Sequence, residues 1–176
     1  MSSPTYTSPQ TLILMGVCGC GKTAVGTLLA QRLGGSFEDG DDFHSDEARE
    51  KMRSGQPLTD DDRRPWYARL RARVEAVRAT GQPYVLACSA LKRDYRAWLR
   101  VGDGPESMRF AHLDGSFELI ESRLAARKGH FMPPTLLASQ FATLELGDDI
   151  TPVDIDQSVE GIVEDILSRI YTKAIA

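Results

Sequence analysis

The sequence contains little cysteine: three of its 176 residues, two of which, Cys18 and Cys20, are separated by a single residue. Thiols this close along a chain rarely reach disulfide geometry, so a disulfide-stabilised scaffold is excluded. Cysteines without a pairing pattern are typical of proteins kept in a reducing compartment. We therefore expect a cytoplasmic protein.

An excess of positive charge is also missing. The 21 basic and 25 acidic residues are intermixed and give a formal net charge of -4. The chain therefore has no overall basic field to attract nucleic acid or an anionic membrane, and neither is expected as a partner. An anionic ligand must instead be bound by a local cluster of cations.

Long apolar runs are absent as well, because none approaches the roughly 18 residues of a membrane span. The first ten residues, MSSPTYTSPQ, have neither the basic start nor the apolar core of a signal peptide. No internal repeat or low-complexity segment divides the rest of the chain. We expect residues 1–10 to form a disordered leader and residues 11–176 to form a single domain.

What the sequence does contain is an alternation of short apolar runs with segments of helical periodicity, and 41% of its residues are hydrophobic. Strands that alternate with helices pair in parallel through right-handed crossovers, which predicts an α/β fold with helices on both faces of the sheet. Two stretches rich in glycine, proline and charge, SGQPLTDDDRRPW and RKGHFMPP, are expected to form mobile lobes. The five strands are expected in TLILMGV, SFED, PYVLACS, MRFAHLD and TPVDID.

The strongest motif follows the first apolar run. Residues 16–23, GVCGCGKT, satisfy the pattern G-x-x-x-x-G-K-[ST] between an expected strand and an expected helix. Glycines let the backbone curl so that N–H groups point at phosphate oxygens, while the helix start adds its positive dipole end. We expect Lys22 to neutralise the β- and γ-phosphates of ATP and Thr23 to bind Mg²⁺. The candidate nucleotide-binding residues are Gly16, Val17, Cys18, Gly19, Cys20, Gly21, Lys22 and Thr23.

This loop alone fits a kinase, a switch GTPase or a regulatory module that binds ATP without turnover. The segment N-K-x-D, which reads guanine, is absent from the chain. Its absence disfavours a GTPase, and the second half of the chain has to distinguish the other two classes.

An acidic turn, EDGDDFH, follows the second expected strand and places Asp39, Asp41 and Asp42 at the edge of the sheet where α/β folds bind ligands. Alternation along an extended chain aims Asp39 and Asp41 in the same direction. One carboxylate is expected to hold hydrated Mg²⁺ and the other to accept a proton from an attacking hydroxyl, as phosphoryl transfer requires. For His44, a structural hydrogen bond and a ligand contact both remain open.

Six arginines lie within residues 61–79, a density that would suit a nucleic-acid surface. Helical spacing gives a different interpretation, because one face carries an apolar stripe and most of the arginines point away from it into solvent. The stripe consists of Trp66, Leu70, Val74 and Val77.

Four further polar residues are candidates for the acceptor site. Arg63 precedes Pro65 at the entrance of this helix, close in sequence to the acidic turn, and can hold an anionic group. Ser89, Lys92 and Arg96 follow the third expected strand, so we expect them at the same edge of the sheet.

Arg123 and Arg127 are one helical turn apart and share a face near the C-terminus of an expected helix. Such a pair can reach bound phosphates when a lid closes. Favourable charge at a helix C-terminus, followed by a cap at Gly129, explains the same residues. Both interpretations remain open.

Several motifs together resemble the gluconate kinase (gluconokinase) family, small P-loop kinases related to shikimate and adenylate kinases. The resemblance runs from Leu12 to Ile170 and rests on GVCGCGKT, DGDDFH, KMRSGQPLTDDDRRPW, ACSALKRDYR, ESRLAARKGHF and VDIDQ. It implies transfer of the γ-phosphoryl group of ATP to the 6-hydroxyl of D-gluconate with Mg²⁺. It also implies a five-stranded parallel sheet of the nucleoside-monophosphate-kinase type, a substrate-binding region at about 40–66, a mobile lid at about 123–145 and a homodimer.

The resemblance also implies roles for single residues. Asp39 matches the metal-side carboxylate, next to Thr23 as the other expected metal ligand, and Asp41 matches the substrate-side carboxylate. A kinase of the shikimate type is the nearest alternative. The residues expected at the sugar acid are Asp41, His44, Arg63, Ser89, Lys92 and Arg96; those expected in catalysis are Lys22, Asp41 and Arg127; and Arg123 is expected to lie on adenine.

The phosphate loop departs from the family pattern, because Cys18 and Cys20 stand where serines are usual. Backbone N–H groups, Lys22 and a helix N-terminus all favour an anion. We therefore expect a lowered thiol pKa and thiolate character at whichever cysteine is exposed. The alternative, that both thiols face the interior as inert apolar groups, also stands.

Overall fold

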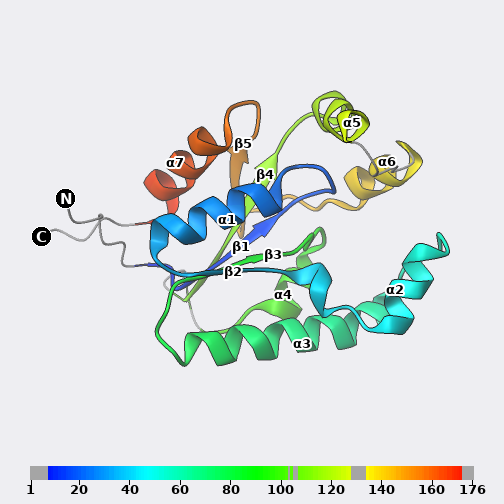
Figure 1. Ribbon diagram of the computed structural model, residues 1–176. Coiled ribbons are helices and arrows are strands. Elements are labelled where there is room, and N and C mark those ends of the chain that lie inside the picture. Colours follow the sequence, from blue (N-terminus) through cyan, green and yellow to red (C-terminus); the bar gives the residue numbers. More distant parts are fainter. Residues whose placement is uncertain (1–7, 103, 105–106, 128–133, 172–176) are drawn as a thin grey trace, which may run out of the picture.

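The computed structural model describes residues 8–102, 104, 107–127 and 134–171. Within these residues, five parallel strands form one sheet in the order β2-β3-β1-β4-β5 (Figure 1). This topology confirms the predicted fold class. The strands are β1 (Thr11–Met15), β2 (Ser36–Asp39), β3 (Tyr84–Ala87), β4 (Met108–Asp114) and β5 (Thr151–Asp154).

Helices cover both faces of the sheet, and each face has its own apolar core. On one face lie α1, α5, α6 and α7, and on the other lie α3 and α4, while α2 projects to the side without a buried residue. The helices are α1 (Lys22–Leu33), α2 (Asp46–Arg53), α3 (Asp60–Arg78), α4 (Arg93–Leu99), α5 (Phe117–Ala126), α6 (Pro134–Thr143) and α7 (Val159–Ile170), with a 3₁₀ turn η1 (Gly40–Phe43) after β2.

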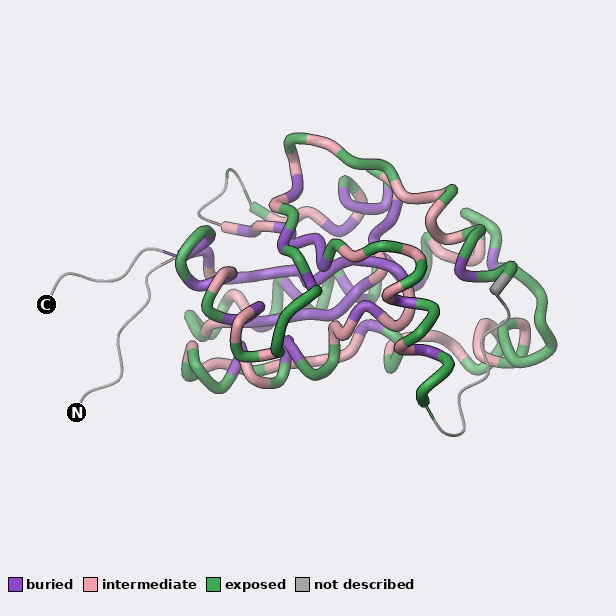
Figure 2. The backbone as a smooth tube through the Cα atoms, turned by 90° about the horizontal axis from the view of Figure 1, so that it is seen from above, coloured by how far each residue is buried: buried purple, intermediate pink, exposed green. Residues whose placement is uncertain are grey.

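The central strand β1 is buried on both faces, which accounts for its unbroken apolar run. Leu12 and Leu14 pack into the core under α1 and α7, whereas Ile13 and Met15 pack under α3 and α4. All four side chains are fully buried. In Figure 2 the strands in the middle of the molecule are coloured as buried, between more exposed helices. Burial of each such side chain stabilises the fold by about 1.5–3 kcal/mol, so the strand that leads into the phosphate loop is firmly anchored.

The apolar stripe predicted in the arginine-rich segment is confirmed in α3. The helix begins at a capping box formed by Thr59 and Asp62. Arg69 and Arg71 are exposed, as expected for a solvated face. The predicted stripe of Trp66, Leu70, Val74 and Val77 is buried, and Tyr67 is buried beside it.

The chain is packed against the sheet from residue 9 onward. Pro9 is buried, and Gln10 accepts a hydrogen bond from Tyr84 N at 2.9 Å and donates one to Arg78 O at 2.8 Å. Residues 9 and 10, expected in the leader, therefore pack with the domain, while residues 1–7 lie outside the described residues. Among the described helices, none is both long and apolar enough to cross a membrane.

Candidate active site

The loop between β1 and α1 curls back on itself through glycines. Gly19 and Gly21 have φ angles of 85° and 102°, in the left-handed region where a side chain would be strained. A Cβ on Gly19 would lie 2.7 Å from the Leu124 side chain of α5. Glycine is thus required here both for the turn and for the close packing of α5 on the loop.

The ammonium group of Lys22 lies inside this curl. Its Nζ donates to Gly16 O at 3.0 Å and to Val17 O at 3.1 Å. The N-terminus of α1, at Gly21, carries no side-chain cap. A cation and a helix N-terminus without a cap make a binding site for an anion, and nucleotide phosphates fit it.

Two oxygen-bearing side chains meet beside the loop. Thr23 Oγ1 donates to Asp39 Oδ2 at 3.2 Å, although the two residues belong to α1 and β2. Among the described residues, no group of three histidine, cysteine or carboxylate side chains could hold a metal ion. The Thr23–Asp39 pair suits Mg²⁺, since this ion keeps several waters and uses one or two protein oxygens plus phosphate oxygens.

Asp41 lies in η1, immediately beyond the Thr23–Asp39 pair. Its backbone N–H donates to Asp39 Oδ1 at 3.1 Å, which fixes the turn. Partial desolvation by the neighbouring protein and the negative charge of Asp39 both raise the pKa of Asp41. The side chain nevertheless keeps 84% of its surface open to solvent. A carboxylate with a raised pKa and free access suits proton acceptance from a hydroxyl.

His44 lies beside Asp41 and packs against Trp66 of α3. Its side chain is 5% exposed and its ring stacks on Trp66 with a centroid separation of 4.2 Å. Burial, helped by the charges of Arg49 and Arg69, lowers the pKa of His44 to about 4, so the ring is neutral at pH 7. Its Nε2 lies 3.8 Å from Asp41 Oδ1. This geometry favours the structural interpretation of His44 over direct contact with a ligand.

Arg63 and Lys92 converge on Tyr95, an aromatic residue of α4. The Arg63 guanidinium lies 5.5 Å and the Lys92 ammonium 5.1 Å from the Tyr95 ring centroid. Tyr95 OH donates to Asp60 Oδ1 at 2.6 Å, and Lys92 Nζ lies 3.5 Å from the same oxygen. No sequence pattern signals this cluster, because its members come from α3 and from the N-terminus of α4.

Arg96 belongs to the interior, which corrects its assignment to the acceptor site. Its side chain is 1% exposed and forms an ion pair with Asp149, in which Nε and Oδ2 are 2.6 Å apart. The remaining guanidinium nitrogens donate to the carbonyls of Ala90, Leu91 and Glu145. A guanidinium with all three nitrogens engaged below the surface has no donor left for a substrate carboxylate.

Ser89 lies just beyond the end of β3, beside the phosphate loop, where its carbonyl accepts a hydrogen bond from Gly16 N at 3.3 Å.

Arg123 and Arg127 lie at the C-terminal end of α5. Arg123 Nη2 donates to Ile155 O at 2.7 Å. Arg127 is exposed, and its charge acts on Cys18 in the phosphate loop. The expected lid includes residues 128–133, which lie outside the described residues.

The predicted thiolate character is wrong for Cys18. The residue is half-buried, and burial raises the pKa of its thiol by more than the neighbouring Lys22 lowers it. Cys20 is fully buried in the core with Val17 and Leu124. The apolar alternative therefore fits Cys20, and neither cysteine forms a disulfide.

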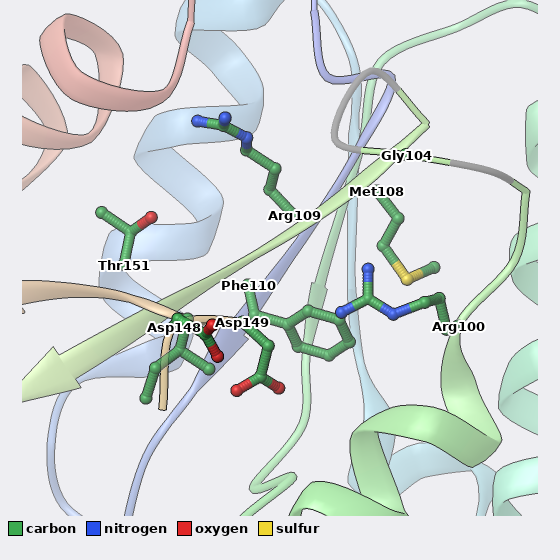
Figure 3. A pocket seen from close by; sticks show the side chains of 9 residues that line it. Arg100, Gly104, Met108, Arg109, Phe110, Asp148, Asp149 and Thr151 are labelled. Carbon is green, nitrogen blue, oxygen red and sulfur yellow. The ribbon is translucent and has the colours of Figure 1, made fainter. Parts of the chain in front are cut away.

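A separate hollow of about 270 Å³ lies at the opposite edge of the sheet (Figure 3). Met108 and Thr151, at the amino ends of β4 and β5, line it, and the Arg100 guanidinium lies 5.1 Å from the Phe110 ring centroid. The phosphate loop follows the carboxyl end of β1, so this hollow is not part of the candidate site.

Comparisons with known proteins match this chain to kinases, as the phosphate loop suggests. A family model described as shikimate kinase matches residues 18–145. The thermoresistant gluconokinase of Escherichia coli K12 is 48% identical over 86% of this chain and 87% of its own length. The gluconokinase of Gluconobacter oxydans 621H is 51% identical over 82% and 80%, and a probable gluconokinase of Xenopus tropicalis is 43% identical over 92% and 94%.

Solved structures give the same picture. A gluconokinase from Sinorhizobium meliloti 1021 has a TM-score of 0.79 at 42% identity, covering 91% of this chain and 90% of its own. The shikimate kinase of Aquifex aeolicus has a TM-score of 0.57 at 17% identity, covering 90% of this chain and 94% of its own. The likeness to the shikimate kinase supports the fold alone, whereas the likeness to the gluconokinase includes the sequence as well.

Proposed function

Because the chain belongs to the gluconokinase family, we propose that it transfers the γ-phosphoryl group of ATP to the 6-hydroxyl of D-gluconate, giving 6-phospho-D-gluconate and ADP. The observation that carries the proposal is the convergence of Lys22, Thr23, Asp39 and Asp41 at the carboxyl edge of β1 and β2. This cluster joins a phosphate-binding cation, a metal-side oxygen pair and a free carboxylate.

Binding of the nucleotide uses the curl of the phosphate loop. Lys22 moves its ammonium from the loop carbonyls to the β- and γ-phosphate oxygens, where it offsets their charge. Thr23 and Asp39 would hold Mg²⁺, which neutralises further phosphate charge. The exposed Arg127 reaches the transferring phosphoryl group, and Arg123 offers the face of its guanidinium to adenine.

Asp41 acts on the acceptor. Its carboxylate accepts the proton of the 6-hydroxyl as that oxygen forms a bond to the γ-phosphorus and the bond to the ADP oxygen breaks. The raised pKa of Asp41 brings it closer to the working pH and so makes it a better proton acceptor. His44 supports the turn that presents this carboxylate.

The charge of the sugar acid is met by Arg63 and Lys92. Both cations lie over Tyr95, and Asp60 lies close to Lys92. The charge of Arg63 also acts on His44, whose ring lies beside Asp41. Arg96 is left out because its donors are used in the interior. An anionic acceptor would give these two cations a further counter-charge that a neutral sugar cannot supply, which favours an anionic acceptor.

The test is release of ADP from ATP, measured with gluconate, shikimate, glucose and AMP as separate acceptors. We expect turnover with gluconate at least tenfold above that with the other three. Faster turnover of shikimate would favour a shikimate-type kinase, and ATP binding without turnover of any acceptor would favour a regulatory module. The homodimer, which the family resemblance implies, and the cytoplasmic location, which the cysteine content suggests, stay predictions. Sedimentation tests the homodimer.

A further inference from the structure

One residue of α6 contacts the phosphate loop through its side chain. The backbone N–H of Cys18 donates to Gln140 Oε1 at 2.7 Å, across 122 positions of the chain. Cys18 is the third residue of the loop, between the glycines that give it its curl. An element remote in sequence therefore fixes the backbone of the nucleotide-binding loop.

Gln140 is a polar residue on the packed face of its helix. Leu137, one turn earlier, is 1% exposed and belongs to the same core as Val17 and Cys20. Phe141 packs on Phe117 of α5 with a centroid separation of 5.6 Å. A polar side chain on such a face costs free energy unless it is hydrogen-bonded, and the Cys18 N–H supplies that bond.

The helix that presents Gln140 is itself held in place. The backbone N–H of Glu145, just beyond α6, donates to Leu91 O at 2.8 Å. The Glu145 carboxylate accepts from Arg93 N at 2.7 Å, at the first residue of α4, and Arg93 Nη2 donates to Leu146 O at 3.0 Å. Helix α6 lies within the expected lid, but these bonds fasten its C-terminal end to α4, so Gln140 reaches the loop from a helix that is held in place.

We propose that Gln140 is a positioning residue for the phosphate loop, an inference that rests on the proposed kinase function. The loop contains glycines with positive φ and has many accessible backbone conformations. The amide oxygen of Gln140 selects the conformation in which the loop encloses phosphates, before the nucleotide arrives. A neutral acceptor is needed because a carboxylate in this place would bring negative charge beside bound phosphates.

The first test removes the hydrogen-bond acceptor and keeps a side chain of similar length. Gln140→Met keeps a long, unbranched, helix-forming side chain but cannot accept the bond. We expect the ADP dissociation constant, measured by calorimetry, to rise about 5–10-fold, with the KM for gluconate unchanged. The exposed neighbour Ser139 provides the matched control, since Ser139→Ala should bind ADP as the parent does. ADP binding by Gln140→Met that equals the parent would overturn the proposal.

The second test keeps the acceptor and adds charge. Gln140→Glu should retain slow amide hydrogen exchange at Cys18 in the nucleotide-free protein, whereas Gln140→Met should lose it. Gln140→Glu should also bind ATP more weakly than the parent, and added salt should reduce this difference by screening. Fast exchange at Cys18 in Gln140→Glu, or ATP binding equal to the parent at low salt, would overturn the proposal even if Gln140→Met failed to fold.

These measurements are independent of the acceptor. A parent protein that binds ADP but does not phosphorylate gluconate would contradict the proposed function and leave the role of Gln140 to be decided by binding and exchange. A parent protein that phosphorylates gluconate, with Gln140→Met unchanged in ADP affinity, would contradict the role of Gln140 alone.

Discussion

Replacement of Asp149 by alanine should destabilise the protein, because it leaves the Arg96 guanidinium without its counter-charge in the interior. Breaking a fully buried ion pair costs about 3–5 kcal/mol. The Asp149 side chain is 28% exposed, so water partly solvates the site, and Arg96 keeps carbonyl partners. We therefore expect a loss of about 2–3 kcal/mol, which for a chain of this size lowers Tm by roughly 5–10 °C.

Thermal denaturation of Asp149→Ala, with the exposed neighbour Asp148→Ala as control, measures this loss directly. Hydrogen bonds from Arg96 lower the pKa of Asp149. The contribution of the pair is therefore complete above the ordinary carboxyl pKa of about 4 and is lost as pH falls below it. An unchanged Tm for Asp149→Ala at pH 7, together with a raised gluconate KM in Arg96→Met, would refute the structural role of Arg96.

Three further predictions concern the site. Asp41→Asn should lower kcat by about 10²–10⁴-fold, measured by steady-state kinetics, and leave the ADP affinity, measured by calorimetry, nearly intact. Asp42→Asn is the control. A kcat of Asp41→Asn near that of the parent would contradict the proton-acceptor role. Lys92→Met should raise the KM for gluconate, because a charge-assisted contact with the substrate would be lost, and should leave Tm unchanged. An unchanged KM would show that Lys92 does not bind the acceptor. Because burial raises the pKa of Cys18, iodoacetamide at pH 7 should react with it more slowly than with free cysteine; rapid inactivation prevented by ATP would show otherwise.

The parts of the fold that depend on local pattern were predictable from the sequence. The unbroken apolar run of β1 indicates a strand covered on both faces, and the spacing of Trp66 and Leu70 indicates the buried stripe of α3. The curl of the phosphate loop was predictable in the same way, because the motif fixes where the glycines that allow the curl must stand.

The parts that depend on contacts between distant segments were not predictable. Arg96 follows β3 as a substrate-binding arginine would, but its partner Asp149 lies 53 residues later. Tyr95 and Asp60 meet only because α3 and α4 pack together. The pKa of Cys18 depends on how deeply the loop is covered, and sequence carries no measure of that coverage.

The proposed reaction transfers phosphate from ATP to one hydroxyl of gluconate. Correlated ¹H–³¹P NMR of the product formed from ATP, Mg²⁺ and D-gluconate tests it most directly. We expect a single new phosphate-ester signal coupled to the two protons on C6, and no such signal when Lys22→Ala replaces the parent. A signal coupled to a proton on another carbon, or no ester at all from the folded parent, would contradict it.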